Sequence, residues 1–491
     1  MDHFPLPRPL HSAPSPQHSA AASEHSSLGT RHSSLSYDDA LAFWFGRVNY
    51  EQKQPAPSDL KLDRMRALLG LVGNPHQRLR IIHVAGSKGK GSTSAMLAAI
   101  LQRAGYRTGL FTSPHLERVE ERIQVDGQPI SAREITALLS RIRDCENQQM
   151  LGGSPSILEG LTFFEIATAV GFLHFVQRRV EAGVIEVGLG GRFDSTNVCQ
   201  PVLSVITSIS FDHTRLLGNR LASIAREKAG IIKPGRPVIS GVAASEARSV
   251  IEDTCRRRGS PVQQLGVDFH YEYTPATITV DRTGLNLPSV RVKTNQRVWP
   301  TMPLGLLGEH QAANAAGVIA SVEELRSQGW HISDEAVKEG LAEVRWPARM
   351  EVLAYQPLVI LDCAHNVASA EALVNTLESS FPPGKRYLIF AGSNDKDIPG
   401  MFRALAPHFH GIFLTRYQNN PRAVAPEELA EQLRPYAASP PTLWPTSRDA
   451  WNASRLLARQ GNLICITGSV FLAGEMRSWL VEELSGKGIR A

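Results

Sequence analysis

The order of apolar and polar positions along the chain predicts two successive α/β units. Short apolar runs of strand length recur through the first half, at 80–85, 107–112, 182–187, 202–209 and 237–241. Segments with helical periodicity separate most of these runs, as at 163–177 and 243–258. Strands that alternate with helices form a parallel sheet covered on both faces, so the predicted fold class is α/β.

The pattern changes once and then restarts. Residues 266–300 contain short alternating segments separated by turn residues, which predicts a small antiparallel insert. Strand and helix patterns alternate again after Trp346-Pro347, where we place a hinge. We therefore expect a first domain over 37–345 and a second α/β domain over 346–491.

Composition narrows the class of protein. Residues 1–36 are rich in Ser, His, Pro and Ala without apolar periodicity, which predicts a disordered tail. No apolar run approaches the ~18 residues of a membrane span, and no signal-peptide pattern is visible. The five cysteines are scattered without metal-binding spacing, as expected of reduced thiols. We expect a cytoplasmic protein without a membrane partner.

The charge balance adds little by itself. A net charge of +5 over 491 residues fits a basic cleft for small anionic substrates as well as it fits nucleic acid. A stripe of basic and aromatic residues, which would indicate nucleic-acid binding, is not visible. We therefore expect small-molecule substrates and no nucleic-acid partner.

A glycine-rich stretch is the most informative feature of the chain. Between residues 82 and 92 an apolar run gives way to a turn that contains Lys90, and a helical pattern follows over 93–104. In such a strand–turn–helix arrangement, backbone N–H groups face an anion and the Lys adds a positive charge for the outer phosphates. The spacing departs from the usual loop because Gly91 stands between Lys90 and Ser92. A purely structural turn is the alternative, but the flanking strand and helix favour nucleotide binding.

Polar residues follow other strands of the first domain. Glu186 interrupts an apolar strand, and a buried carboxylate needs a cation or hydrogen-bond partners; we interpret it as a metal ligand. Ser113 also follows a strand and is well placed for Mg²⁺, although the local sequence alone favours a simple turn. His213 fits a metal ligand, a general base or a structural pair. Lys228, taken alone, fits a solvated helix face.

The second domain repeats this arrangement. Asp362–Asn366 ends a strand and opens a helix, which is where open α/β sheets bind ligands. Ser393–Asp397 and Ser469 follow two further strands in the same way. Arg349 lies just after the hinge and could stabilise a transferring phosphoryl group. Two lobes around a cleft suit an ATP-dependent joining reaction, because closure excludes water from a reactive intermediate.

Taken together, these motifs resemble the Mur ligase superfamily, most closely the folylpolyglutamate synthases and bifunctional dihydrofolate synthase/folylpolyglutamate synthases. The resemblance extends from about residue 40 to the C-terminus. It rests on motifs in the family's order, namely Val84–Ser92, Phe111–Leu116, Leu161–Glu165, Glu186–Asn197, Asp212–Thr214, Arg226–Ile231, Gly308–Ala315 and Asp362–Asn366. Lys88 stands where the family often has Asn, and Cys363 replaces a frequent Gly.

This resemblance implies a P-loop, Mur-ligase-like ATPase domain with a parallel sheet, followed by a Rossmann-like C-terminal domain. It implies an enzyme, an ATP-dependent acid–amino-acid ligase that joins L-glutamate to a folate carboxylate through an acyl phosphate. The acid would be tetrahydrofolate, in polyglutamylation, and also dihydropteroate. Family precedent indicates a monomer.

The resemblance also assigns residues. The ATP phosphates would be held by Gly86, Ser87, Lys88, Gly89, Lys90, Gly91 and Ser92, and the nucleotide would also contact Asn314, Arg349 and Asp362. One Mg²⁺ would bind Ser113 and Glu186, and a second would bind His213. Lys228 would be carbamylated and help order the second metal, and a monovalent cation is a further implied cofactor. The pterin site would include Thr162, Phe164 and Asp194, and the incoming glutamate would lie near His365 and Ser469. The catalytic residues would be Lys90, Lys228, His213 and Arg349.

Two other functions stay open at this point. A peptidoglycan-type Mur ligase would act on another carboxylate, but it carries a nucleotide-sugar domain before the phosphate loop, and only about 50 ordered residues precede Gly86. A non-catalytic ATP-binding regulator would be favoured by loss of Lys90, Glu186, His213 or Lys228, and all four are present. The sequence does not decide between dihydropteroate and reduced folate as the acid.

Overall fold

The computed structural model describes residues 35–51, 59, 61–150, 158, 160–211, 218–277, 286–381, 384–418, 420–458 and 461–486. Residues 1–34 of the predicted tail lie outside the described residues, and so does His213.

The first sheet carries the glycine-rich loop. In the described residues it has eight strands in the order β4-β3-β2-β5-β1-β6-β7-β8. Their bounds are β1 Ile81–Ala85, β2 Thr108–Phe111, β3 Ile123–Val125, β4 Gln128–Pro129, β5 Ala182–Glu186, β6 Leu203–Ile206, β7 Val238–Ser240 and β8 Val262–Gln264. The strands from β2 to β8 in this order are parallel; β3 pairs antiparallel with β2, and β4 pairs antiparallel with β3 at the edge. The predicted parallel sheet is confirmed.

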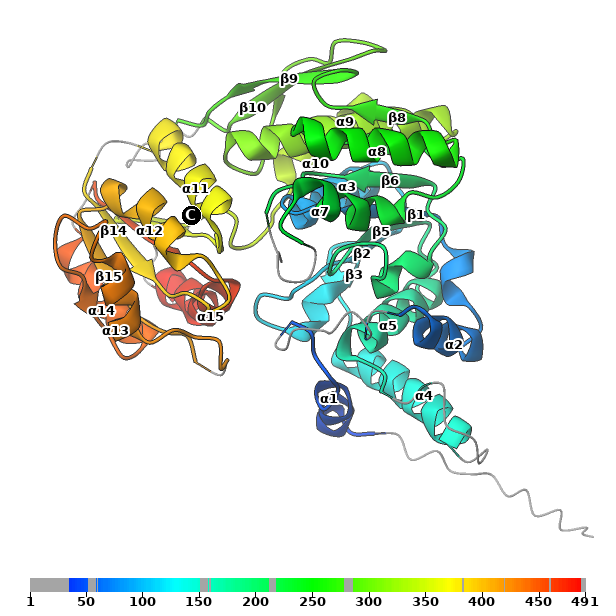
Figure 1. Cartoon of the computed structure of the whole chain (residues 1–491), viewed down its shortest axis with the longest axis horizontal. Helices are drawn as coiled ribbons and strands as arrows, with labels where there is room; N and C mark the ends of the chain where they lie inside the picture. Colours follow the sequence, from blue (N-terminus) through cyan, green and yellow to red (C-terminus); the bar gives the residue numbers. More distant parts are fainter. Residues whose placement is uncertain are drawn as a thin grey trace, which may run out of the picture. The chain divides into compact units, whose positions relative to one another are not determined.

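Helices cover both faces of this sheet (Figure 1). They are α1 Tyr37–Phe45, α2 Asp63–Leu71, α3 Lys90–Arg103, α4 Ala132–Met150, α5 Phe163–Gln177, α7 Leu221–Lys228, α8 Ser245–Arg258, α9 Glu309–Ser327 and α10 Asp334–Glu343, with short 3₁₀ turns at Pro75–Arg78, Val119–Arg122, Ser195–Val198 and Ala229–Ile231. Successive residues of β1 face opposite sides: Ile82 and Val84 pack with α3, α9 and α10, whereas Ile81 packs with α1, α2, α4 and α5.

A small antiparallel sheet follows β8. In the described residues it consists of β9 Phe269–Thr274, β10 Ser289–Thr294 and β11 Met302–Pro303, in the order β11-β10-β9. Val290 and Val292 of β10 are buried and alternate with exposed residues. They join the core that also contains α9, so this sheet is half-buried and faces the helix.

The second large sheet is also α/β. Its six strands in the described residues run in the order β12-β13-β17-β14-β15-β16. They are β12 Glu351–Tyr355, β13 Leu358–Leu361, β14 Arg386–Phe390, β15 Gly411–Leu414, β16 Thr442–Leu443 and β17 Leu463–Thr467. All pairs are parallel except β12–β13. The helices α11 Val367–Ser380, α12 Ile398–Leu405 and α13 Pro426–Leu433 pack in one core, and α14 Ser447–Leu457 and α15 Val470–Gly486 pack in another. A 3₁₀ turn covers Ala406–His408.

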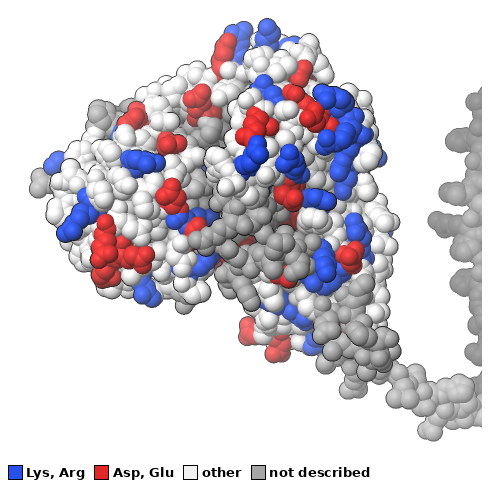
Figure 2. Space-filling view, viewed as in Figure 1, with Lys and Arg blue, Asp and Glu red and all other residues white. Residues whose placement is uncertain are grey.

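Two general properties complete the fold. On the face shown in Figure 2, basic side chains are interspersed with acidic ones. In the part of the chain that the structure describes, no helix is long and apolar enough to cross a membrane.

Candidate active site

The glycine-rich loop joins the carboxyl end of β1 to α3. Gly86 and Gly89 have φ of +152° and +81°, a region that L side chains rarely adopt. A Cβ at Gly86 would lie 1.9 Å from Thr207 Oγ1, and one at Gly89 would lie 2.4 Å from Asn314 Oδ1. Because Gly89 caps the helix, α3 begins at Lys90, three residues earlier than predicted. No side chain caps this N-terminus, so its N–H groups can bind an anion.

Hydroxyl groups after β6 hold the loop from one side. Thr207 Oγ1 donates a hydrogen bond of 2.6 Å to the Lys88 carbonyl. The backbone N–H of Ser87 donates to the Ser208 carbonyl at 2.7 Å. The side chain of Ser208 accepts from the Lys88 N–H at 3.1 Å. The loop is therefore shaped by the chain itself, before any nucleotide binds.

Lys228, the last residue of α7, lies beneath the same loop. Its side chain is buried, and Nζ donates to the Gly86 carbonyl at 2.8 Å. The solvated-face interpretation of Lys228 is therefore wrong. A buried amine is costly without partners, and this hydrogen bond explains how it is tolerated.

Glu186 ends β5, the strand next to β1. It is 4% exposed, and Oε2 accepts from the Ser113 N–H at 3.2 Å. Burial raises the pKa of Glu186 to about 6, and Lys90, the Ser113 N–H and Arg349 oppose that rise. No salt bridge joins Glu186 to a basic residue in the described part of the chain. The structure thus brings Glu186 and Ser113 together.

These two residues fit a magnesium ion. The described residues contain no group of three or more His, Cys, Asp or Glu that could hold a metal, and His213 lies outside them. Mg²⁺ is commonly held by one or two protein oxygens together with substrate phosphates, so a large cluster is not required. A buried carboxylate without a paired cation, beside a phosphate loop, has the chemistry of such a ligand.

A second glycine-rich loop follows β5, with glycines at positions 188, 190 and 191, and Asp194 organises it. Its carboxylate accepts from the N–H of Leu189 at 2.8 Å and the N–H of Thr196 at 3.0 Å, and from Thr196 Oγ1 at 2.5 Å. Burial raises the pKa of Asp194, and these hydrogen bonds oppose the rise. His83 of β1 adds a further hydrogen bond to this network, because its Nε2 lies 2.9 Å from Thr196 Oγ1. Asp194 therefore fixes the shape of this loop.

Phe164 and Thr162 lie at the start of α5. A Cβ at Gly188 would be 2.4 Å from the Phe164 ring, so the ring packs directly on the loop. Thr162 caps α5: its Oγ1 accepts from the Glu165 N–H at 3.2 Å, and Glu165 accepts from the Thr162 N–H at 2.8 Å. The Thr162 hydroxyl therefore helps to set the direction in which Phe164 leaves the helix.

The segment between α10 and β12 approaches the phosphate loop. Trp346 packs on this loop, because a Cβ at Gly91 would lie 3.0 Å from Trp346 Nε1. Ala348 and Met350, on either side of Arg349, have φ of +54° and +48°. Non-glycine residues in this region cost about 1–3 kcal/mol each and need support from their surroundings.

That support comes from two carboxylates. Glu351 accepts from the Ala348 N–H at 2.8 Å, and Asp362 accepts from the Met350 N–H at 3.0 Å. Burial lowers the pKa of Arg349, while Asp362 and Glu186 raise it. Arg349 is thus within electrostatic range of carboxylates from both large sheets, beside the loop that also contacts Asn314.

His365 and Ser469 lie after neighbouring strands of the second sheet. His365 Nδ1 is 2.9 Å from the Cys363 carbonyl. Ser469 is buried, and its Oγ accepts from the Phe471 N–H at 3.1 Å. The two residues are thus placed by β13 and β17, at the same edge as Asp362.

Sequence reasoning missed the hydroxyls that shape the phosphate loop. Thr207 and Ser208 follow β6 directly, and β6 pairs with β1 in parallel. Hydroxyl residues at the carboxyl end of a strand next to the loop were the signal that could have identified them. No such sequence signal pointed to Trp346, because its contact with Gly91 depends on how the preceding helix α10 packs.

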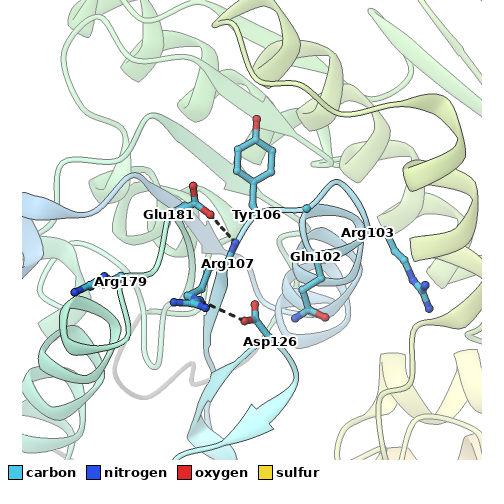
Figure 3. Close-up of a pocket in the computed structure, with 8 residues that line it drawn as sticks. Gln102, Arg103, Tyr106, Arg107, Asp126, Arg179 and Glu181 are labelled. Atoms are coloured by element: carbon cyan, nitrogen blue, oxygen red, sulfur yellow. Dashed lines mark hydrogen bonds and ion pairs between the residues drawn. The ribbon is translucent and has the colours of Figure 1, made fainter. Parts of the chain in front are cut away.

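One cavity lies elsewhere on the first sheet. It has a volume of about 750 Å³ and is lined by Gln102, Arg103, Gly105, Tyr106, Arg107, Asp126, Arg179 and Glu181 (Figure 3). Arg107 and Glu181 directly precede β2 and β5, so the cavity is at the amino ends of these strands. The Arg107 N–H donates to Glu181 at 2.9 Å, and its guanidinium lies 3.8 Å from Asp126. This cavity is therefore separate from the phosphate loop at the carboxyl ends.

Comparisons with known proteins agree with this arrangement. The Mur ligase middle domain family matches residues 84–322, and the Mur ligase glutamate ligase domain family matches residues 348–470. The dihydrofolate synthase/folylpolyglutamate synthase of Bacillus subtilis is 37% identical over 455 residues, covering 91% of this chain and 99% of that protein.

Solved structures agree as well. A Mycobacterium tuberculosis folylpolyglutamate synthase complexed with ADP is 32% identical, with a TM-score of 0.81 over 91% of this chain and 98% of that one. E. coli FolC in complex with DHPP and ADP is 28% identical, with a TM-score of 0.78 over 92% and 99%. The chain therefore belongs to the Mur ligase superfamily, within the family of folylpolyglutamate synthases and dihydrofolate synthases.

Proposed function

We propose that this protein is an ATP-dependent ligase that joins L-glutamate to the carboxylate of a folate. The acid is tetrahydrofolate, whose glutamate chain is extended, and also dihydropteroate, which becomes dihydrofolate. The observation that carries the proposal is the convergence of Lys90, Glu186 and Arg349 at one phosphate loop. The named relatives, and the ADP and DHPP bound to solved neighbours, support the choice of substrates.

In the first step, a carboxylate oxygen of the folate attacks the γ-phosphorus of ATP, and the bond to ADP breaks. The loop N–H groups at the start of α3 and the Lys90 ammonium hold the phosphates. Arg349 adds a second positive charge as the phosphoryl group moves. These charges offset the repulsion between two anions, and the product is an acyl phosphate.

Ser113 and Glu186 would hold one Mg²⁺, and His213 would hold a second. When bound, the ions neutralise phosphate charge. Lys228 is the residue we expect to be carbamylated, which would turn its buried amine into an anion that helps order the second metal. A monovalent cation is a further expected cofactor.

In the second step, the amino group of L-glutamate attacks the activated carbonyl. The C–N bond forms, the C–O bond to phosphate breaks, phosphate leaves and the amine loses a proton. His365 and Ser469 would lie near this glutamate, and Thr162, Phe164 and Asp194 would shape the pterin site. We infer that the domains are 37–345 and 346–491, and that the protein works as a monomer in the cytoplasm.

The test is glutamate-dependent ADP release from Mg-ATP, measured in parallel with dihydropteroate and with tetrahydrofolate. Release with both acids establishes both activities, and release with tetrahydrofolate alone restricts the enzyme to chain extension. Release with another acid only would identify a Mur-type ligase for a different carboxylate. Nucleotide binding without any release would identify a regulator and refute the proposal.

A further inference from the structure

Arg477 of α15 forms hydrogen bonds to carboxylates from both large α/β regions. Its Nη2 and Nε donate to Glu351 at 2.8 and 2.9 Å, and its Nη1 donates to Glu117 Oε1 at 2.6 Å. Glu351 begins β12 in the second sheet, whereas Glu117 lies in the loop that follows β2 in the first. A guanidinium that binds one carboxylate through two parallel N–H donors is held in a defined orientation. The third nitrogen of Arg477 therefore presents a fixed donor to the first region.

The three side chains of this network are shielded from most of the solvent. Arg477, Glu117 and Glu351 are 24%, 23% and 21% exposed. Partly buried charge pairs are screened by salt much less than exposed ones, and networks with bidentate geometry contribute more than isolated surface pairs. The network can therefore restrain the two elements that it joins.

Backbone packing brings the same two elements together. Gly474 lies three residues before Arg477, on the same face of α15. A Cβ at Gly474 would be 2.0 Å from the Leu116 carbonyl oxygen, so a larger residue would not fit there without a shift of the backbone. The Leu116 side chain packs against the apolar core that contains α15. The loop with Leu116 and Glu117 is therefore seated on α15 by shape as well as by charge.

On the side of the first sheet, this loop carries a residue of the candidate magnesium site. Ser113 lies four residues before Glu117, and its N–H donates to Glu186 at 3.2 Å. Glu121 holds the loop together, because its carboxylate accepts from the Leu116 N–H at 2.9 Å. A restraint on Glu117 is therefore passed to Ser113 through a short, internally bonded loop.

On the side of the second sheet, Glu351 supports the segment that carries Arg349. Its Oε2 accepts from the Ala348 N–H at 2.8 Å, and Ala348 has a φ of +54°. A non-glycine residue with this backbone conformation needs support from its surroundings. Arg477 fixes the carboxylate that supplies this support, so the conformation beside Arg349 depends on Arg477.

We propose that Arg477 is a positioning residue for phosphoryl transfer. It holds the loop that carries Ser113 and the segment that carries Arg349 at one separation, so that both can act on the same phosphoryl group. The proposal rests on the proposed function and deepens it. Arg477 acts through Glu117 and Glu351 rather than by touching a substrate.

The kinetics of Arg477→Gln test the effect on the reaction. The kcat for glutamate-dependent ADP release should fall about 10- to 100-fold, because misplacing a reacting group by about 1 Å can cost about 100-fold. The KM for L-glutamate should stay within about twofold, since the lost interaction acts in the transition state. Arg477→Lys should recover part of the loss, because it keeps the charge without the two parallel donors. Arg448→Gln, which breaks the 2.8 Å ion pair between α14 and Glu483 of α15, is the matched control and should keep kcat within about twofold.

A double substitution shows whether the two residues act as one unit. Glu117→Gln alone should also lower kcat. Combined with Arg477→Gln it should lower kcat no further, because Arg477→Gln has already broken the same contact. Losses that multiply in the double variant would show that Glu117 and Arg477 act independently, which would contradict the proposal.

Hydrogen–deuterium exchange tests the same link without any substrate. In the full-length protein, Glu117→Gln should raise deuterium uptake at 346–351, a segment far from Glu117 in the sequence. Arg477→Gln should raise uptake there and at 113–118, and Arg448→Gln should raise it at neither. Glu117 is a partly exposed loop residue, so its variant remains informative even if Arg477→Gln fails to fold.

The exchange result is separate from the activity and would stand even if no folate proved to be a substrate. Unchanged uptake at 346–351 in Glu117→Gln would overturn the proposal. A kcat for Arg477→Gln equal to that for Arg448→Gln would overturn it as well.

Discussion

The carboxyl edges of the two large sheets differ in how their polar groups are satisfied. Thr207 and Thr415 are buried residues that directly follow parallel strands, β6 and β15. Thr207 Oγ1 donates to the Lys88 carbonyl at 2.6 Å, whereas Thr415 Oγ1 has no partner among the described residues. The first edge is held by hydrogen bonds within the chain, whereas the second contains polar side-chain atoms that the described residues leave without partners.

The largest expected effect comes from the first edge. Lys90→Ala removes the ammonium group at the start of α3 that we expect to bind the outer phosphates, so glutamate-dependent ADP release should fall about 100- to 1,000-fold or more. Thermal melting should stay close to that of the parent, because Lys90 is partly exposed. Lys338→Ala, at an exposed residue of helix α10, is the control. Near-normal turnover in Lys90→Ala would show that Lys90 is not needed to hold the ATP phosphates and would contradict the proposed phosphate loop.

A pH experiment tests the buried carboxylate of the first edge. The pKa of Glu186 is raised from 4.5 to about 6, so its stabilising, protonated state is fully present below about pH 4.5 and is lost as pH rises through 6. This rise corresponds to about 2 kcal/mol. In chelator, Glu186→Gln should therefore keep about 2 kcal/mol of unfolding free energy near pH 7.5 that the parent loses.

Urea unfolding at about pH 4.5 and about pH 7.5 measures this difference. Added Mg²⁺ should stabilise the parent at the higher pH more than it stabilises Glu186→Gln, because the Glu186 carboxylate is the charged ligand of one proposed Mg²⁺ site. Identical pH profiles for the two proteins would contradict the raised pKa of Glu186. Equal stabilisation of the two proteins by Mg²⁺ would show that Glu186 is not a metal ligand.

The smallest expected effects come from substituting Thr207 and Thr415, the two threonines that follow corresponding strands of the two sheets. Thr207→Val removes the shorter of the two hydroxyl hydrogen bonds to the Lys88 carbonyl, leaving the one from Ser208 Oγ, and should cost about 1 kcal/mol of unfolding free energy. Thr415→Val removes a hydroxyl that has no partner among the described residues, so its cost should be below about 0.5 kcal/mol. Urea unfolding measures both. Equal costs would show that the two edges are alike in the free protein.

Local sequence patterns were sufficient for the sheets because apolar runs such as 182–187 become strands, here β5 at Ala182–Glu186. They also placed Glu186 and Asp362 at strand ends. The burial of Lys228 could not be predicted from the sequence, because it depends on how α7 packs against the loop that contains Gly86. The ion pair between Arg422 Nη1 and Asp395 Oδ2, at 3.5 Å, could not be predicted either. These residues follow two different strands, β15 and β14, and they meet only because those strands pair in the sheet.

The most direct test of the central claim is the mass of the reaction product. The protein is incubated with Mg-ATP, L-glutamate and either tetrahydrofolate or dihydropteroate, and the products are resolved by mass spectrometry. The account predicts that each acid gains glutamyl residues, with one phosphate released for each residue added, and no product without ATP. ADP formation with the acids unchanged in mass would contradict it.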